Sequence, residues 1–141
     1  MRSIHHRGSV ERPGLVLALD ADTGTACDGM ALRVAPGTEE ATLAYLRERE
    51  LVSSAYVEKT LDVQLEDGRT VAALVYVIDA EHDQYCGGLP LEEQAQIISG
   101  AVGGMGPNTE YLFNTAAHLT QIGLHDPSLA WLHDRVKTLC A

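Results

Sequence analysis

The chain has 141 residues, of which 45% are hydrophobic and 21% are charged, a composition that excludes a disordered or fibrous protein. Ten basic residues stand against twenty acidic ones, which gives a formal charge of −10 at pH 7. This charge repels nucleic-acid phosphates and anionic membrane surfaces, and no local basic patch offsets it. We therefore expect neither a nucleic-acid partner nor a membrane partner.

The cysteines and the N-terminal residues indicate a reducing compartment. Cys27, Cys86 and Cys140 show no Cys-x-x-Cys spacing, so neither a disulfide framework nor a zinc knuckle is favoured. Residues 1–6 contain no apolar stretch like that of a signal peptide, and the longest apolar runs of the chain have the length of strands. We predict a single domain over residues 1–141, in a reducing compartment.

Residues 15–46 predict two strands followed by a helix. Residues 15–19 and 29–34 are short apolar runs bounded by glycine, proline, aspartate or threonine, which is typical of strands. From Glu39 to Leu46 the pattern is helical, and acidic side chains occupy the first turn, where the helix dipole favours them.

A β-hairpin is predicted next. Residues 57–65 alternate between apolar and polar side chains, Asp67-Gly68 supplies a turn, and residues 71–78 are apolar throughout. A strand without alternation is typical of a sheet that is covered on both faces. We therefore predict that the second strand is central and buried.

Glycines mark the end of the following helix. Helical periodicity starts at Leu91, with Pro90 at the first helical position, and ends in the group Gly100, Gly103, Gly104 and Gly106. Nucleotide-binding glycine loops follow a strand and open a helix, whereas this group follows a helix, and no Gly-Lys-Ser/Thr motif occurs. Helix capping and close backbone packing are favoured over phosphate binding.

Two more helices complete the chain. Asn108 is predicted to be the N-cap of one that Gly123 terminates, and Asp126-Pro127 begins another with apolar side chains at helical spacing. Strands come mostly first and helices mostly last. This order predicts an α+β fold, with a small, mostly antiparallel barrel or curled sheet flanked by helices.

No motif for metal binding or covalent catalysis is present. The six histidines lack a His-Glu-x-x-His pattern or another tight ligand spacing. No Gly-x-Ser-x-Gly elbow occurs, and Cys86 lies in a predicted loop without an assignable base. The residues by themselves therefore favour neither a metal site nor covalent catalysis.

One carboxylate differs from the others in its predicted position. At about 100° per residue, Glu50 falls on the same helix face as Leu43 and Leu46, whereas Glu48 points away from it. A carboxylate at the end of an apolar stripe loses hydration, and desolvation suits such a group to proton transfer at neutral pH. The alternatives are that the helix has ended by Glu50 and its side chain is solvated, or that Glu50 pairs with Arg47 or Arg49.

Longer motifs carry a family resemblance. They are Arg7-Gly8-Ser9-x-Glu11-x-Pro13-Gly14-Leu15-Val16-Leu17, Cys27-x-Gly29-x-Ala31-x-Arg33-Val34, Tyr45-Leu46-x-x-Arg49-Glu50, Ala73-Leu74-Val75-Tyr76, Tyr85-x-Gly87, Gly106-x-Asn108-x-Glu110-Tyr111-Leu112 and Leu124-x-Asp126-x-x-Leu129. With these motifs in this order from residue 7 to its end, the chain resembles the ChaC family of glutathione-specific γ-glutamylcyclotransferases.

The resemblance implies a cytosolic enzyme with a small barrel and flanking helices. Such an enzyme cleaves glutathione to 5-oxoproline and cysteinylglycine without a metal or cofactor. The glutamate of the family's Arg-Glu pair is the catalytic acid/base, and this role falls on Glu50. The helical geometry had selected the same residue.

The substrate pocket is predicted from the remaining motifs. We assign substrate binding to Tyr111, Asn108 and the segment Arg7-Gly8-Ser9. Tyr111 either forms a hydrogen-bonding wall of the pocket or is a core tyrosine on a buried helix face. Arg7 either meets a substrate carboxylate or braces the first loop, because Arg-Gly-Ser is typical of a turn.

The chain departs from the family pattern at its start. The family's Tyr-Gly-Ser-Leu strand and loop are absent upstream of Arg7, so we expect the fold to lack its first strand and to expose a sheet edge that invites a homodimer. Three interpretations follow: a fragment of a longer enzyme, a truncated relative that only binds γ-glutamyl peptides or a protein, or an enzyme with a rebuilt pocket. We favour the first.

Overall fold

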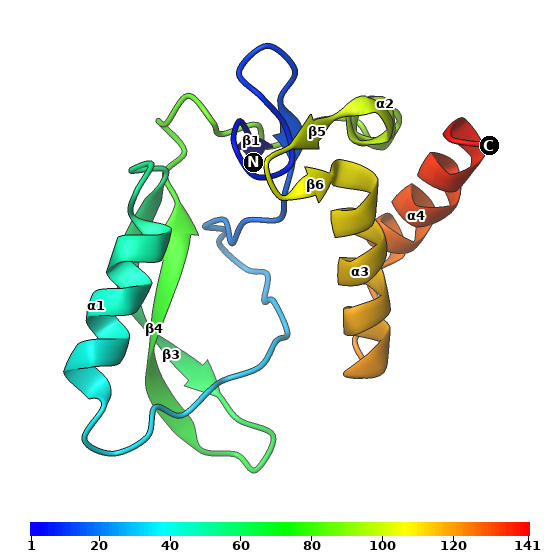
Figure 1. Cartoon of the computed structure of the whole chain (residues 1–141). Coiled ribbons are helices and arrows are strands. Elements are labelled where there is room, and N and C mark those ends of the chain that lie inside the picture. Colours follow the sequence, from blue (N-terminus) through cyan, green and yellow to red (C-terminus); the bar gives the residue numbers. More distant parts are fainter. The chain divides into compact units, whose positions relative to one another are not determined.

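The computed structural model describes residues 1–141, which form two compact units (Figure 1). The first unit comprises Met1–Leu17 and Cys86–Ala141, and the second comprises Ala18–Tyr85. The first unit combines three helices with two antiparallel two-stranded sheets, and the second combines one helix with one such sheet. The prediction of an α+β fold is confirmed.

The first unit contains three helices and the hydrophobic core. They are α2 (Leu91–Gly100), α3 (Asn108–Gln121) and α4 (Pro127–Leu139), which lie beside one another in Figure 1. All members of the core cluster belong to this unit: Leu15, Ala95, Ile98, Leu112, Leu129, Leu132 and Val136. Burying a side chain of this kind contributes roughly 1.5–3 kcal/mol, so the three helices hold one another in place.

Local sequence signals set the bounds of these helices. The Asp126 side chain accepts hydrogen bonds from the backbone N–H groups of Ser128 and Leu129 at 2.8 and 3.0 Å, which caps α4. Gly123 has a φ of +78°, a left-handed conformation that terminates the helical path after α3. Both features were predicted from the sequence.

Two short sheets complete the first unit. Strand β1 (Arg2–Ser3) pairs with β2 (Gly14–Leu15), and β5 (Val102–Gly103) pairs with β6 (Gly106–Pro107). The predicted glycine group therefore contributes to a hairpin as well as to the end of α2.

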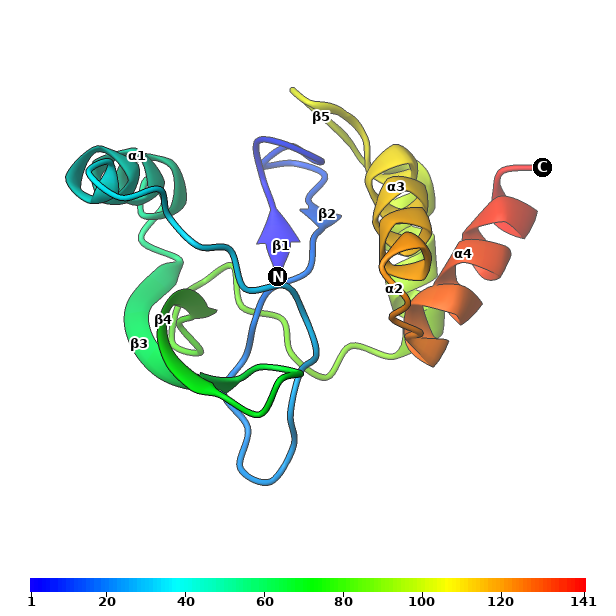
Figure 2. The same ribbon diagram turned by 90° about the horizontal axis from the view of Figure 1, so that it is seen from below.

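The second unit consists of one helix and one long hairpin. Helix α1 (Glu39–Glu50) precedes β3 (Tyr56–Gln64) and β4 (Thr70–Ile78), which pair in antiparallel register from Tyr56 opposite Ile78 to Gln64 opposite Thr70. Figure 2 shows the marked curl of this hairpin. The predicted helix and hairpin are confirmed. The sheet is curled, and none of the three sheets has more than two strands, so none closes into a barrel.

Three strand predictions were wrong. Only Gly14–Leu15 and an isolated bridge between Leu19 and Val77 form in the region predicted as a strand over residues 15–19. Residues 29–34 are irregular and exposed, because no neighbouring strand satisfies their backbone groups. Apart from the isolated bridge at Val77, β4 pairs only with β3 and is not a central strand, and it is buried only at Val77 and Ile78.

Two predicted helix starts are shifted by one residue. Pro90 is the N-cap of α2 and not its first helical residue. Asn108 is the first residue of α3, whose N-cap is Pro107, and it makes no capping hydrogen bond. The Asn108 side chain is instead bonded to β2, a contact across 93 residues of sequence that outweighs its local capping preference.

Candidate functional site

Glu50 is the last residue of α1, on the face predicted for it. Leu43, Leu46 and Glu50 are half-buried, whereas Glu48 is exposed. The helix therefore extends far enough to place Glu50 with the apolar side chains, as the periodicity indicates. The Glu50 side chain is 28% exposed, which keeps its carboxylate within reach of a solute.

An arginine at the preceding position contacts this carboxylate. Arg49 Nε lies 3.2 Å from Glu50 Oε1, and the Arg49 side chain is 65% exposed. Of the two pairings considered from the sequence, the structure contains the one with Arg49. An exposed pair of this kind is weak and is readily exchanged for water or for another ligand.

Arg47 pairs with a different acidic residue. Its Nε and Nη2 donate to Glu58 Oε2 and Oε1 at 2.9 and 2.8 Å, a bidentate contact between α1 and β3. Tyr76 on β4 donates its hydroxyl hydrogen to Glu58 Oε2 at 3.1 Å. The Arg47 guanidinium lowers the pKa of Glu58, and burial, followed by the bond to Glu58, raises the pKa of Tyr76. The carboxylate thus stays ionised and the phenol stays protonated near neutral pH.

The other five predicted site residues belong to the first unit. Arg7 Nη1 donates to the Pro107 carbonyl oxygen at 3.2 Å and lies 3.5 Å from Glu110 Oε1. The Arg7 guanidinium carbon also lies 5.8 Å from the centre of the Tyr111 ring, within the range of a cation–π contact. Arg7 therefore braces the first loop against the start of α3, which is one of its two predicted roles.

Asn108 and Tyr111 bind the chain around β2. Asn108 is fully buried, and its side-chain amide accepts from Leu15 N–H at 2.6 Å and donates to Leu15 C=O at 2.7 Å. Tyr111 Oη accepts from Leu17 N–H at 3.1 Å, which leaves the hydroxyl hydrogen available to a further acceptor. The structure thus gives Asn108 a structural role, and the substrate contact assigned to it stays a prediction.

Gly8 and Ser9 form a tight turn. Ser9 N–H donates to the Arg12 carbonyl at 3.0 Å, and Ser9 Oγ accepts from Arg12 N–H at 3.1 Å. A Cβ atom at Gly8 would lie 2.0 Å from the nitrogen of Gly14, and one at Gly103 would lie 2.4 Å from the nitrogen of Gly8. Close backbone approach, as predicted for the glycine group, requires glycine at these positions.

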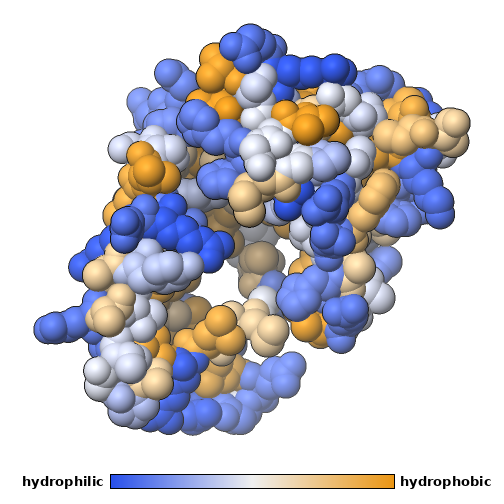
Figure 3. All heavy atoms as spheres, in the orientation of Figure 1, coloured by the Kyte–Doolittle hydropathy of each residue, from blue (hydrophilic) through white to orange (hydrophobic).

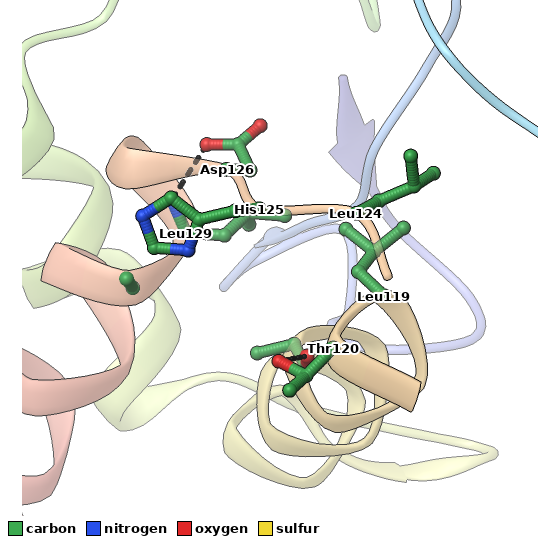
Figure 4. A pocket seen from close by; sticks show the side chains of 8 residues that line it. Leu119, Thr120, Leu124, His125, Asp126 and Leu129 are labelled. Atoms are coloured by element: carbon green, nitrogen blue, oxygen red, sulfur yellow. Dashed lines mark hydrogen bonds between the residues drawn. The ribbon is translucent and has the colours of Figure 1, made fainter. Parts of the chain in front are cut away.

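Two small pockets open on the first unit. One of about 60 Å³ is lined by Tyr111 together with mostly apolar residues, which include Leu15 and Leu17. The other, of about 40 Å³, lies between the end of α3 and the start of α4 and contains none of the predicted site residues (Figure 4). The pocket beside Tyr111 is therefore the one that contains a predicted site residue.

Other classes of site have little support. No group of three or more histidine, cysteine, aspartate or glutamate side chains is placed to hold a metal ion. None of the four helices combines the length and the apolar character that crossing a membrane requires. The face shown in Figure 3 carries separate hydrophobic patches among hydrophilic side chains.

The fold matches solved structures of one class of enzyme. Two crystal structures of a γ-glutamyl cyclotransferase specific to glutathione from yeast superpose with a TM-score of 0.76 each, at 19% and 20% sequence identity. They cover 97% and 99% of this chain and 81% and 84% of the yeast chains. The chain therefore has the γ-glutamylcyclotransferase fold.

The chain belongs to the ChaC-like protein family, whose model matches residues 1–139. A glutathione-specific γ-glutamylcyclotransferase of Escherichia coli is 35% identical over 96% of this chain, and the human glutathione-specific γ-glutamylcyclotransferase 1 is 33% identical over 95%. The chain spans 58% and 62% of the length of these two relatives. The family match runs through both units, while a single domain over residues 1–141 stays a prediction.

Sequence reasoning did not assign roles to Glu58, Tyr76 and Glu110. Tyr76 and Glu110 occur in motifs of the family resemblance, and Glu58 occupies a polar position in the alternation of β3. The hydrogen-bond and ion-pair partners of these residues lie at least 11 residues away in the sequence and outside the element that carries the residue. No local sequence pattern therefore reveals these contacts.

Proposed function

We propose that this chain cleaves glutathione to 5-oxoproline and cysteinylglycine, with Glu50 as general acid and base. Membership of the ChaC-like family over residues 1–139 is the observation that carries the proposal. Relatives at 33–35% identity bear the name glutathione-specific γ-glutamylcyclotransferase. The half-buried Glu50 at the end of α1 supplies a carboxylate suited to proton transfer.

The chemistry needs one such carboxylate because the nucleophile belongs to the substrate. The α-amine of the γ-glutamyl group, with a reference pKa of about 8, is largely protonated at neutral pH. Glu50 takes a proton from this ammonium group, and the freed nitrogen attacks the γ-carbonyl carbon. The new C–N bond closes the lactam, and the bond to the cysteinyl nitrogen breaks as Glu50 returns the first proton to that nitrogen. Glu50 then moves a second proton from the lactam nitrogen to the released amine, so that the lactam is neutral and cysteinylglycine leaves as an ammonium. No water is consumed.

Residues of the first unit are assigned to binding. Tyr111 retains a hydroxyl hydrogen that a substrate oxygen can accept, and its neighbouring pocket of about 60 Å³ is mainly apolar. The substrate roles of Arg7, Gly8, Ser9 and Asn108 form part of the same proposal. Holding the tripeptide folded for ring closure supplies rate through orientation.

The cellular setting forms a second part of the proposal. The three cysteines are all free, which supports a reducing compartment and the cytoplasmic location expected from the sequence. Glutathione is the small-molecule partner.

We also retain the proposed homodimer, supported by the exposed alternating side chains Met30, Leu32 and Val34. Light scattering should report twice the 15.2 kDa chain mass, and a monomer would contradict this part.

The test of the proposed reaction is product formation. The purified chain is incubated with glutathione, and 5-oxoproline and cysteinylglycine are quantified by mass spectrometry. We expect both in equal amounts, and less product from γ-glutamyl-alanine. A folded sample that binds glutathione without releasing 5-oxoproline would contradict the proposed reaction and support a binding module.

A further inference from the structure

Three side chains join the end of α1 to both strands of the hairpin. Arg47 on α1 makes its bidentate contact to Glu58 on β3, and Glu58 accepts from Tyr76, its cross-strand neighbour on β4. Arg47 precedes Glu50 by three residues, so both belong to the last turn of the helix. The contacts that fix Arg47 therefore also fix the turn that carries Glu50.

Apolar burial does little to hold this helix. None of the twelve residues of α1 is buried, and Leu43 and Leu46 are only half-buried. An isolated helix shorter than about 12–15 residues is marginal in water, and its stability in a protein normally comes from packing of an apolar face. The polar link through Glu58 is consequently a main restraint on the orientation of α1.

A second restraint holds the other side of Glu50. The connection to β3 turns sharply at Ser54, which has a φ of +55°. Ala55 is fully buried, and its carbonyl accepts from Asp79 N–H at 2.8 Å. Glu50 lies between this anchored turn and the Arg47 contact, so rotation of the last helical turn requires one of the two to break.

We propose that Arg47, Glu58 and Tyr76 are positioning residues that set the direction of the Glu50 carboxylate for the reaction, an assignment that rests on the proposed function. We assign their effect to the helix and the hairpin and not to a contact with the substrate, although the charge of Glu50 also acts on the Tyr76 hydroxyl and raises its pKa. Because Arg47 lowers the pKa of Glu58, the restraint persists through the neutral pH range in which proton transfer by Glu50 is needed.

The kinetic test uses Arg47→Met and Tyr76→Phe in the full chain. Misplacing a catalytic group by about 1 Å costs up to about 100-fold in rate, so we expect kcat for glutathione to fall about tenfold in each variant with KM nearly unchanged. Arg47→Lys keeps the charge but not the bidentate fork, and it should recover part of the loss. A kcat within about twofold of the wild-type value in both variants would overturn the proposal.

The matched control breaks another arginine–carboxylate pair of the same hairpin. Arg69 Nη2 lies 2.7 Å from Asp67 Oδ2 in the turn between β3 and β4. This turn is at the opposite end of the hairpin from the Glu58–Tyr76 pair. Arg69→Met should leave kcat unchanged. A loss equal to that of Arg47→Met would assign the effect to general loosening of the hairpin and contradict positioning.

A second readout does not depend on turnover. Leu51 N–H donates to the Arg47 carbonyl at 3.0 Å, so its exchange with deuterium reports on the last turn of α1. We expect the amides of Glu50 and Leu51 to exchange about tenfold faster in Arg47→Met and Tyr76→Phe, and not in Arg69→Met. Unchanged exchange would overturn the positioning role even if the wild-type chain releases 5-oxoproline. Faster exchange without wild-type turnover would support the restraint and reject the proposed function.

Discussion

The two units are stabilised in different ways. In the first unit, α2, α3 and α4 surround a core that includes Leu112, Leu132 and Val136, whose exposed fractions are 3% or less. In the second, the buried apolar residues are Ala55, Val77 and Ile78, and the contacts of α1 include the polar chain through Glu58. The proposed acid/base thus lies in the unit with less apolar burial.

This difference places most of the stabilising apolar core in one unit and the proposed acid/base in the other. Regions with few buried apolar contacts open at lower free energy than packed cores, and elements that serve ligands are often drawn from them. A carboxylate at the end of a lightly packed helix stays accessible to a solute. Its direction must then come from hydrogen bonds and ion pairs, which fix angles more sharply than apolar packing does.

The same substitution in both units gives the largest expected contrast. Leu132→Ala removes a side chain that is 3% exposed, and it should lower the free energy of unfolding by about 3 kcal/mol through lost burial and a cavity. Leu61→Ala on β3 removes one that is 42% exposed and should cost less than about 1 kcal/mol. Urea unfolding measures both. Equal losses would break the contrast between the units.

A buried amide should have the next largest effect. Asn108→Ala leaves the N–H and C=O groups of Leu15 without partners, so we expect a loss of about 2 kcal/mol in the free energy of unfolding. Asn114→Ala on the exposed face of α3 is the control and should cost less than about 0.5 kcal/mol. If the two variants unfold at the same urea concentration, the structural role given to Asn108 is wrong.

An exposed ion pair should have the smallest effect. Arg135 donates to both carboxylate oxygens of Glu92 at 2.8 and 2.6 Å and lowers the pKa of Glu92 to about 2. A folded-state pKa below the unfolded value means that the stabilisation is present above about pH 5 and is lost as the pH falls toward 2.

The Tm of the variant Glu92→Gln should therefore fall less between pH 6 and pH 3 than the Tm of the wild type does. Glu93→Gln, which removes the same charge from the same turn, is the control and should follow the wild type. The difference should shrink in high salt, because an exposed pair is screened. Parallel curves for the wild type and Glu92→Gln would exclude this contribution.

Features that depend on local sequence were predictable. The cap at Asp126, the stop at Gly123 and the hairpin turn at Asp67-Gly68 depend on neighbouring residues, and the structure contains all three. The predicted alternation of β3 is not borne out by burial, because the apolar Val57 and Leu61 are exposed whereas Glu58 is half-buried. The half-buried face of Glu50 followed from a rotation of about 100° per residue. Helix and hairpin signals therefore defined most of the architecture.

Features that depend on residues far away in the sequence were not predictable. Residues 29–34 have strand composition, but a strand needs a neighbour, and sequence composition does not supply one. Asn108 has a strong N-cap preference, yet its side-chain amide is hydrogen-bonded to the backbone of Leu15. Arg47 pairs with Glu58 because the hairpin places β3 beside α1. This placement is a property of the folded chain and cannot be derived from the local sequence.

Two glutamates on one helix provide the most direct test of the central claim. Glu50 lies on the half-buried face of α1, whereas Glu48 is exposed, and glutamine at either position preserves the size of the side chain. Release of 5-oxoproline from glutathione is measured for both variants, with circular dichroism to verify folding. Glu50→Gln should lower kcat by about 100-fold or more, and Glu48→Gln should leave it unchanged. Wild-type turnover in folded Glu50→Gln would contradict the account.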